Sequence, residues 1–165
     1  MSIAYIIDSS TELNASIRNQ DNVFVLPFKG YDSNGNLKSI AQSKQVTAIQ
    51  KDRIEGSKLF IEPTPGIYRD LYKSLKQEGF DYVVCIPQSK NQSGSYINAE
   101  YASRFYKGFV VVIDSVEYNS EPQDILTNLL EEQEIKDDSI IMELDFDKFI
   151  EFIVNLINKT KIVSI

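Results

Sequence analysis

Short runs of apolar residues alternate with segments of helical periodicity along most of this chain. The strongest runs are Ile3–Ile7, Val23–Leu26, Tyr82–Cys85 and Phe109–Ile113. Continuous apolar runs of this length are typical of strands that are buried on both faces of a sheet. Because strands that alternate with helices form right-handed βαβ units, we predict a three-layer α/β/α fold with one largely parallel sheet.

The helical segments carry start and stop signals. Thr64 and Pro65 predict the start of a helix, because Thr caps helix N-termini and Pro fits the first helical position, and Gly79 predicts its end. Further helices are predicted at 46–54, from Ser93 to Tyr106, from Ser120 onward and from Asp145 to Lys159. Two weaker strands are predicted at Lys58–Ile61 and Ile162–Ile165, and a polar loop at Gly30–Leu37.

Composition restricts the function classes. The chain has 165 residues, 42% of them hydrophobic, which predicts one globular domain with a core of its own. A net charge of −7 without a basic stripe disfavours nucleic-acid binding. No apolar run is long enough to span a bilayer, and the N-terminus has neither a basic segment nor a cleavage site. The single cysteine, Cys85, lies in an apolar run and predicts a small core residue in a reducing compartment, so we expect a cytoplasmic protein.

The chain contains no histidine. This composition excludes hydrolases of the Ser-His-Asp and Cys-His types, unless a lysine or a carboxylate acts as the base. With a single cysteine, the sequence also lacks the ligands of a histidine-containing or thiolate zinc site.

Ser93, Gly94 and Ser95 follow the strand at Tyr82–Cys85 and open the next helix. A turn of this kind brings free backbone N–H groups, two hydroxyls and the positive end of a helix dipole together, which suits phosphate, sulfate or carboxylate. In the structural alternative, Ser93 caps the helix and Gly94 allows close packing.

Asp-Ser pairs follow two other predicted strands, at Asp8-Ser9 and Asp114-Ser115. Since ligands of parallel sheets bind beyond the carboxyl ends of the strands, these pairs and Ser93 are expected at one sheet edge. Two such aspartates can hold Mg²⁺ in a phosphate-transfer enzyme, or they can cap helices and tie loops together.

Several motifs occur in order along the chain: IAYIIDSSTEL, VFVLPF, EPTPGIY, SKNQSGSYINA and VVVIDS. In their order and spacing the sequence resembles the N-terminal domain of the DegV family of fatty-acid-binding proteins, from Ile3 to about Ser120. The resemblance implies a protein without a cofactor and without catalysis of its own. It would bind a long-chain fatty acid and present the carboxyl group to a fatty acid kinase.

The resemblance also implies where the carboxylate is held. In the family, an S-G-T segment and a Thr-Ser pair supply hydroxyl and N–H donors; the first matches Ser93, Gly94 and Ser95, and the second matches Phe60 and Ile61, which have no hydroxyl. Glu62 stands where the family usually has Gln, and its charge would repel a carboxylate. The candidate ligand-binding residues are Ser9, Ile61, Glu62, Ser93, Gly94 and Ser95, with no metal ligand among them.

These departures imply weaker fatty-acid binding than is usual in the family. They leave two alternatives open, a degenerate domain that acts through protein–protein contacts and a small Mg²⁺-dependent enzyme acting on a phosphorylated metabolite. Family members carry a second, lipid-covering domain, and we expect residues 1–165 to form a single N-terminal-type domain without it.

The last predicted helix is apolar around much of its circumference, with Phe149, Phe152 and Leu156 on different sides. One sheet cannot cover all of them, so we predict an exposed apolar patch and self-association into a homo-oligomer through the segment Asp145–Ile165.

Overall fold

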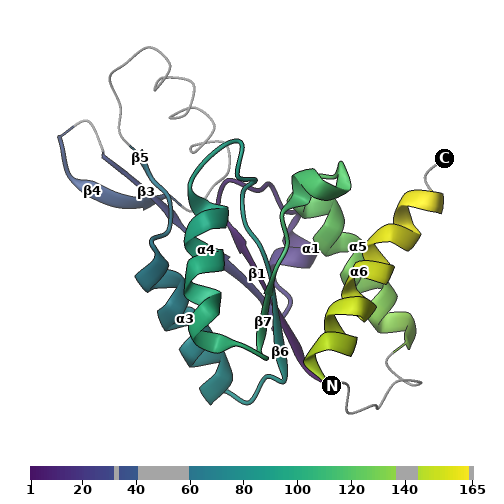
Figure 1. Ribbon diagram of the computed structural model, residues 1–165. Coiled ribbons are helices and arrows are strands. Elements are labelled where there is room, and N and C mark those ends of the chain that lie inside the picture. The colour runs from purple at the N-terminus through teal and green to yellow at the C-terminus, as the bar shows by residue number, and fades with distance from the viewer. Residues whose placement is uncertain (32–33, 41–59, 137–144, 164–165) are drawn as a thin grey trace.

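A four-stranded parallel sheet lies at the centre of the molecule (Figure 1). The computed structural model describes residues 1–31, 34–40, 60–136 and 145–163. The strand order is β2-β1-β6-β7, and all neighbours are parallel. The strands are β1 (Ile3–Asp8), β2 (Val23–Leu26), β6 (Tyr82–Ile86) and β7 (Val110–Val112). All four predicted strands are therefore confirmed, and Cys85 is buried in β6 as expected.

Helices cover both faces of this sheet (Figure 1). On one face lie α3 (Pro65–Gln77) and α4 (Ser95–Ser103), and on the other lie α1 (Ala15–Arg18), α5 (Pro122–Lys136) and α6 (Phe146–Val163); two short 3-10 helices are η1 (Arg104–Tyr106) and η2 (Ser115–Tyr118). Side chains alternate along β1, so that Ala4 and Ile6 join the core under α3 and α4, while Ile3, Tyr5 and Ile7 join the core under α5 and α6. The predicted three-layer α/β/α fold is confirmed.

A second, antiparallel sheet was not predicted. It consists of β3 (Phe28–Tyr31), β4 (Leu37–Ile40) and β5 (Phe60–Ile61) in the order β4-β3-β5. The predicted loop at Gly30–Leu37 is wrong at both ends, because Gly30 lies in β3 and Leu37 begins β4. Cross-strand pairing stabilises these strands, which are too short to be stable alone. The predicted strand at Lys58–Ile61 is confirmed for its last two residues, and the helix predicted at 46–54 lies outside the described residues.

The helix starts agree with the sequence at α3 and differ at α4. Thr64 caps α3, since its Oγ1 accepts a hydrogen bond from Ile67 N at 3.3 Å, and Gly79 follows the helix with a φ of +96°. Helix α4 begins at Ser95 rather than Ser93, and its N-cap residue is Gly94. Ser93 precedes the N-cap residue, and its hydroxyl accepts a hydrogen bond from Ser95 N at 3.3 Å. The helix also ends as a 3-10 turn, η1.

The apolar patch predicted on the last helix is not found among its described side chains, which end at Lys159. Phe149 and Leu156 are buried and Phe152 is half-buried. Helix α6 packs against α5 and the sheet together, so a helix that is apolar on more than one side is still covered within one chain. The strand predicted at Ile162–Ile165 is also wrong at its start, because α6 continues to Val163. Self-association stays a prediction without this support.

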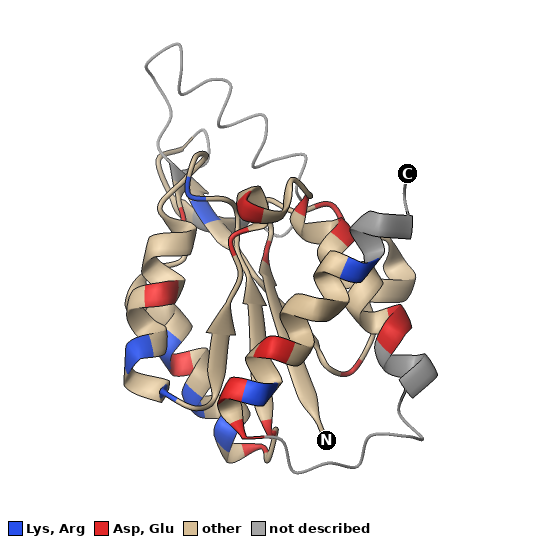
Figure 2. Ribbon diagram, turned by 45° about the vertical axis from the view of Figure 1, so that its right-hand side comes forward, with Lys and Arg blue, Asp and Glu red and all other residues tan. Residues whose placement is uncertain are grey.

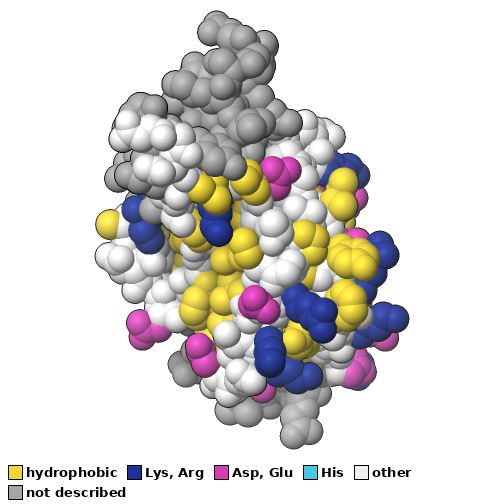
Figure 3. Space-filling view, turned by 90° about the vertical axis from the view of Figure 1, so that its left-hand side faces the viewer, with side chains coloured by type: hydrophobic (Ala, Val, Ile, Leu, Met, Phe, Trp, Pro, Cys, Tyr) yellow, Lys and Arg dark blue, Asp and Glu magenta, His cyan; other side chains and the backbone are white. Residues whose placement is uncertain are grey.

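The outer face of α3 and α4 combines aromatic and cationic side chains, and Figure 3 shows hydrophobic groups beside Lys and Arg on this side. Phe105 and Tyr101 are exposed, with the Arg69 guanidinium 4.5 Å from the Phe105 ring centre and Arg104 5.7 Å from that of Tyr101. These cation–π contacts shield the exposed rings from water. Among the described residues, none of the helices is long and apolar enough to cross a membrane.

Candidate functional site

Glu62, directly after β5, reaches the turn that precedes α4. Its Oε1 accepts a hydrogen bond from Gly94 N at 2.9 Å. A Cβ at Gly94 would lie 2.6 Å from the same oxygen, so the missing side chain is what allows this close approach. Pro63 follows Glu62, and its carbonyl oxygen accepts a hydrogen bond from the Asn98 side chain of α4 at 3.0 Å. This bond holds the same segment against α4. A carboxylate therefore already lies at the positive end of the α4 dipole.

Ser93 and Ser95 extend this turn toward the end of β1. The Ser93 hydroxyl donates to Ser95 Oγ at 3.2 Å. Ser95 is fully buried beside the Asp8 carboxylate, whose pKa it lowers. The structure thus brings Ser93, Gly94, Ser95 and Glu62 together beside the carboxyl end of β1, and Ile61 lies next to them in β5, opposite Lys29.

Asp8 ties the loops after β1 and β6 together. Its Oδ2 accepts from Gln88 N at 2.7 Å, and its Oδ1 accepts from Ser10 N at 3.1 Å and from the Ser10 hydroxyl. Burial raises the pKa of Asp8 above its ordinary value, while the hydrogen bonds from Ser10, Gln88 and Ser95 lower it in part. These donors occupy both carboxylate oxygens of Asp8. Of the two predicted roles, Mg²⁺ binding and tying loops together, this arrangement is the second.

The other residues at strand ends also make structural contacts. Ser9 is buried, and its hydroxyl accepts a hydrogen bond from Phe28 N at 2.8 Å, which links β1 to β3. Asp114 accepts from Val116 N at 3.4 Å, and its Oδ2 lies 3.4 Å from Lys90 Nζ. Within the described ranges, no three carboxylate, histidine or cysteine groups gather in a way that could hold a metal ion. Figure 2 shows acidic residues around this end of the sheet.

Tyr68 of α3 is a buried tyrosine with an unusual environment that the sequence did not single out. It is fully buried, and its hydroxyl has no hydrogen-bond partner in the described structure. Burial raises the pKa of Tyr68 well above its usual value, the charges of Cys85, Asp8 and Glu62 raise it further, and Ser95 lowers it in part. The neighbouring Tyr72, in contrast, donates to Ala99 O at 3.0 Å. A buried donor without an acceptor is unfavourable and marks a position where a ligand oxygen would be stabilised.

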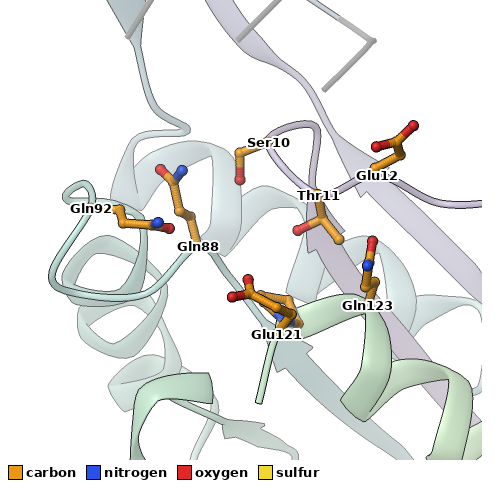
Figure 4. A pocket seen from close by; sticks show the side chains of 8 residues that line it. Ser10, Thr11, Glu12, Gln88, Gln92, Glu121 and Gln123 are labelled. Atoms are coloured by element: carbon orange, nitrogen blue, oxygen red, sulfur yellow. The ribbon is translucent and has the colours of Figure 1, made fainter. Parts of the chain in front are cut away.

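A polar cleft of ≈ 200 Å³ opens at the same sheet edge (Figure 4). Three segments line it: the loop after β1, the loop after β6 and the start of α5. The lining residues are Ser10, Thr11, Glu12, Gln88, Gln92, Glu121, Pro122 and Gln123. Nearly all of them are polar, so this cleft suits water and polar groups rather than an acyl chain.

Comparison with known proteins agrees with this architecture. The family model described as "Uncharacterised protein, DegV family" matches residues 2–127. A DegV domain-containing protein of Listeria monocytogenes is 28% identical over 150 residues, which cover 87% of this chain and 52% of the relative.

Two solved structures share the fold. A fatty-acid-binding DegV family protein from Thermus thermophilus has a TM-score of 0.66 at 21% identity, covering 96% of this chain and 54% of that one. The Fatty Acid Kinase (Fak) B3 protein of Streptococcus pneumoniae, loaded with linoleic acid, has a TM-score of 0.60 at 17% identity, covering 94% of this chain and 54% of that one. The chain therefore spans about half the length of the proteins it matches. From the family match and the shared fold, the chain belongs to the DegV family.

Proposed function

We propose that this chain binds the carboxyl group of a long-chain fatty acid at the turn formed by Ser93, Gly94 and Ser95. The observation that carries the proposal is the bond between Gly94 N and a carboxylate oxygen at 2.9 Å, because it indicates that this turn accepts a carboxylate. The Ser93 hydroxyl, once it turns away from Ser95 Oγ, and the unpartnered hydroxyl of Tyr68 are the donors for the second oxygen of such a group.

Similar proteins support the choice of ligand. The Thermus thermophilus protein is a fatty-acid binder, and the Streptococcus pneumoniae protein carries linoleic acid and belongs to a fatty acid kinase system. By analogy, we propose that the bound carboxyl group is presented to a fatty acid kinase and that the chain itself catalyses no reaction. We further propose that the acyl chain is covered by protein beyond the described fold, since the cleft at this edge is polar.

Replacing Ser93 with alanine tests the proposal. A hydroxyl bonded to a charged acceptor contributes about 1.5–3 kcal/mol, so oleate affinity should fall by about 10-fold to 150-fold. Isothermal titration calorimetry of the purified chain measures this change, and native mass spectrometry reads out any fatty acid that co-purifies. The matched control is Ser74→Ala, on the exposed surface of α3. Equal oleate affinity in the two variants would argue against carboxylate binding at this turn.

A further inference from the structure

We propose that Glu62 is an internal ligand of this site: it occupies the Gly94 N–H in the free chain, and an incoming carboxylate has to displace it. This inference rests on the proposed function and names what controls affinity at the site. It makes Glu62 a specificity-determining residue, because its negative charge disfavours a ligand that carries the same charge.

The geometry leaves room for one carboxylate at Gly94. Glu62 Oε1 lies 2.9 Å from Gly94 N and fills the space in which a Cβ of residue 94 would stand, only 2.6 Å away. A second carboxylate bonded to the same N–H would meet the first at contact distance, where like charges repel strongly. The two carboxylates therefore compete for this donor.

Glu62 is held in place by little else. Among the described residues, the bond to Gly94 is the one hydrogen bond or ion pair of its side chain, and the residue is half-buried rather than enclosed. Asp8, in contrast, is fully buried and accepts hydrogen bonds from the N–H and hydroxyl of Ser10 and from Gln88 N. Displacing Glu62 therefore breaks a single hydrogen bond, and the released carboxylate can be hydrated.

Tyr68 gives a ligand an advantage that Glu62 does not have. Its hydroxyl is fully buried and donates to no acceptor among the described residues. A ligand carboxylate on Gly94 N–H has a second oxygen, and we assign this oxygen to the Tyr68 O–H. Exchange of Glu62 for the ligand would then satisfy a buried donor that is unsatisfied in the free chain.

The test compares Glu62→Ala and Glu62→Gln with the wild-type chain in two measurements. The first is the hydrogen-exchange rate of the Gly94 amide by NMR, which should rise about 10-fold or more in Glu62→Ala as the N–H loses its acceptor. The second is oleate affinity by calorimetry, which should increase about 10-fold or more in Glu62→Ala and less in Glu62→Gln, whose neutral amide oxygen still accepts the bond. Added oleate should slow the exchange of Gly94 again. Glu78→Gln, exposed at the end of α3, is the control for net charge.

The outcomes separate this inference from the proposed function. Unchanged Gly94 exchange in Glu62→Ala, or unchanged oleate affinity beside a loss of stability, would overturn the inference and leave Glu62 a structural tie. Faster Gly94 exchange in Glu62→Ala, with oleate binding to neither protein, would support the role of Glu62 as internal ligand and overturn fatty-acid binding instead.

Discussion

Replacing Phe149 with alanine is expected to lower the free energy of unfolding by about 3–5 kcal/mol. Phe149 of α6 is fully buried, and its ring stacks on that of Tyr82 in β6 with the ring centres 4.0 Å apart and an interplanar angle of 10°. The substitution removes this aromatic contact and leaves a cavity between the helix and the sheet. Urea denaturation followed by circular dichroism measures the change.

Phe105→Ala is the matched control, because Phe105 is 52% exposed on the outer face of the molecule. It should cost less than about 1 kcal/mol, mainly through the lost contact with Arg69. Similar losses for the two variants would contradict the packing of α6 on the sheet.

Replacing Asp8 with alanine is expected to cost about 3 kcal/mol or more of unfolding free energy. The substitution removes the acceptor of two backbone N–H groups, those of Ser10 and Gln88, and of the hydroxyl of Ser10. Each buried donor left without an acceptor costs about 1–3 kcal/mol. Asp70→Ala on the exposed side of α3 is the control and should change stability by about 0.5 kcal/mol or less. Chemical denaturation measures both variants. A midpoint of Asp8→Ala equal to that of wild type would refute the role of Asp8 in tying the loops.

The same residue predicts a pH dependence. Because burial raises the pKa of Asp8 in the folded chain, the folded chain keeps this proton at a pH where the unfolded chain has lost it. The contribution of Asp8 to stability is therefore fully present below its ordinary pKa of about 3.9 and is lost as the pH rises through the raised folded value. From acid to neutral pH, the unfolding free energy of wild type should fall relative to that of Asp8→Asn and then stay constant relative to it. An unfolding free energy of wild type that rises relative to that of Asp8→Asn would contradict the direction of the pKa shift.

Local sequence patterns predicted the part of the fold that has strong local signals. The strands β1, β2, β6 and β7 are continuous apolar runs, and α3 has both a cap and a terminating glycine. The small sheet escaped prediction, although a strand was predicted at β5, because β3 and β4 are short and the sheet depends on pairing between distant segments. The covered surface of α6 could not be foreseen for a related reason: what buries a helix depends on its neighbours in space, here α5 and the sheet together.

The site was predicted in part. The turn at Ser93–Ser95 and its position at the end of the sheet follow from the strand-to-helix order of the chain. Glu62 was recognised as an unfavourable charge, but its bond to Gly94 depends on how β5 approaches α4, which no local pattern contains. Tyr68 was not singled out, since nothing in the sequence distinguishes a buried tyrosine with an acceptor, such as Tyr72, from one without.

The most direct test of carboxylate binding at this turn is an NMR titration of the uniformly ¹⁵N-labelled chain with oleate. We expect the largest amide shifts at Gly94 and Ser95, together with Glu62, whose side chain leaves Gly94 as the ligand binds. Shifts confined to α5 and α6, or a spectrum that oleate leaves unchanged, would contradict the proposal that this edge of the sheet binds a fatty-acid carboxylate.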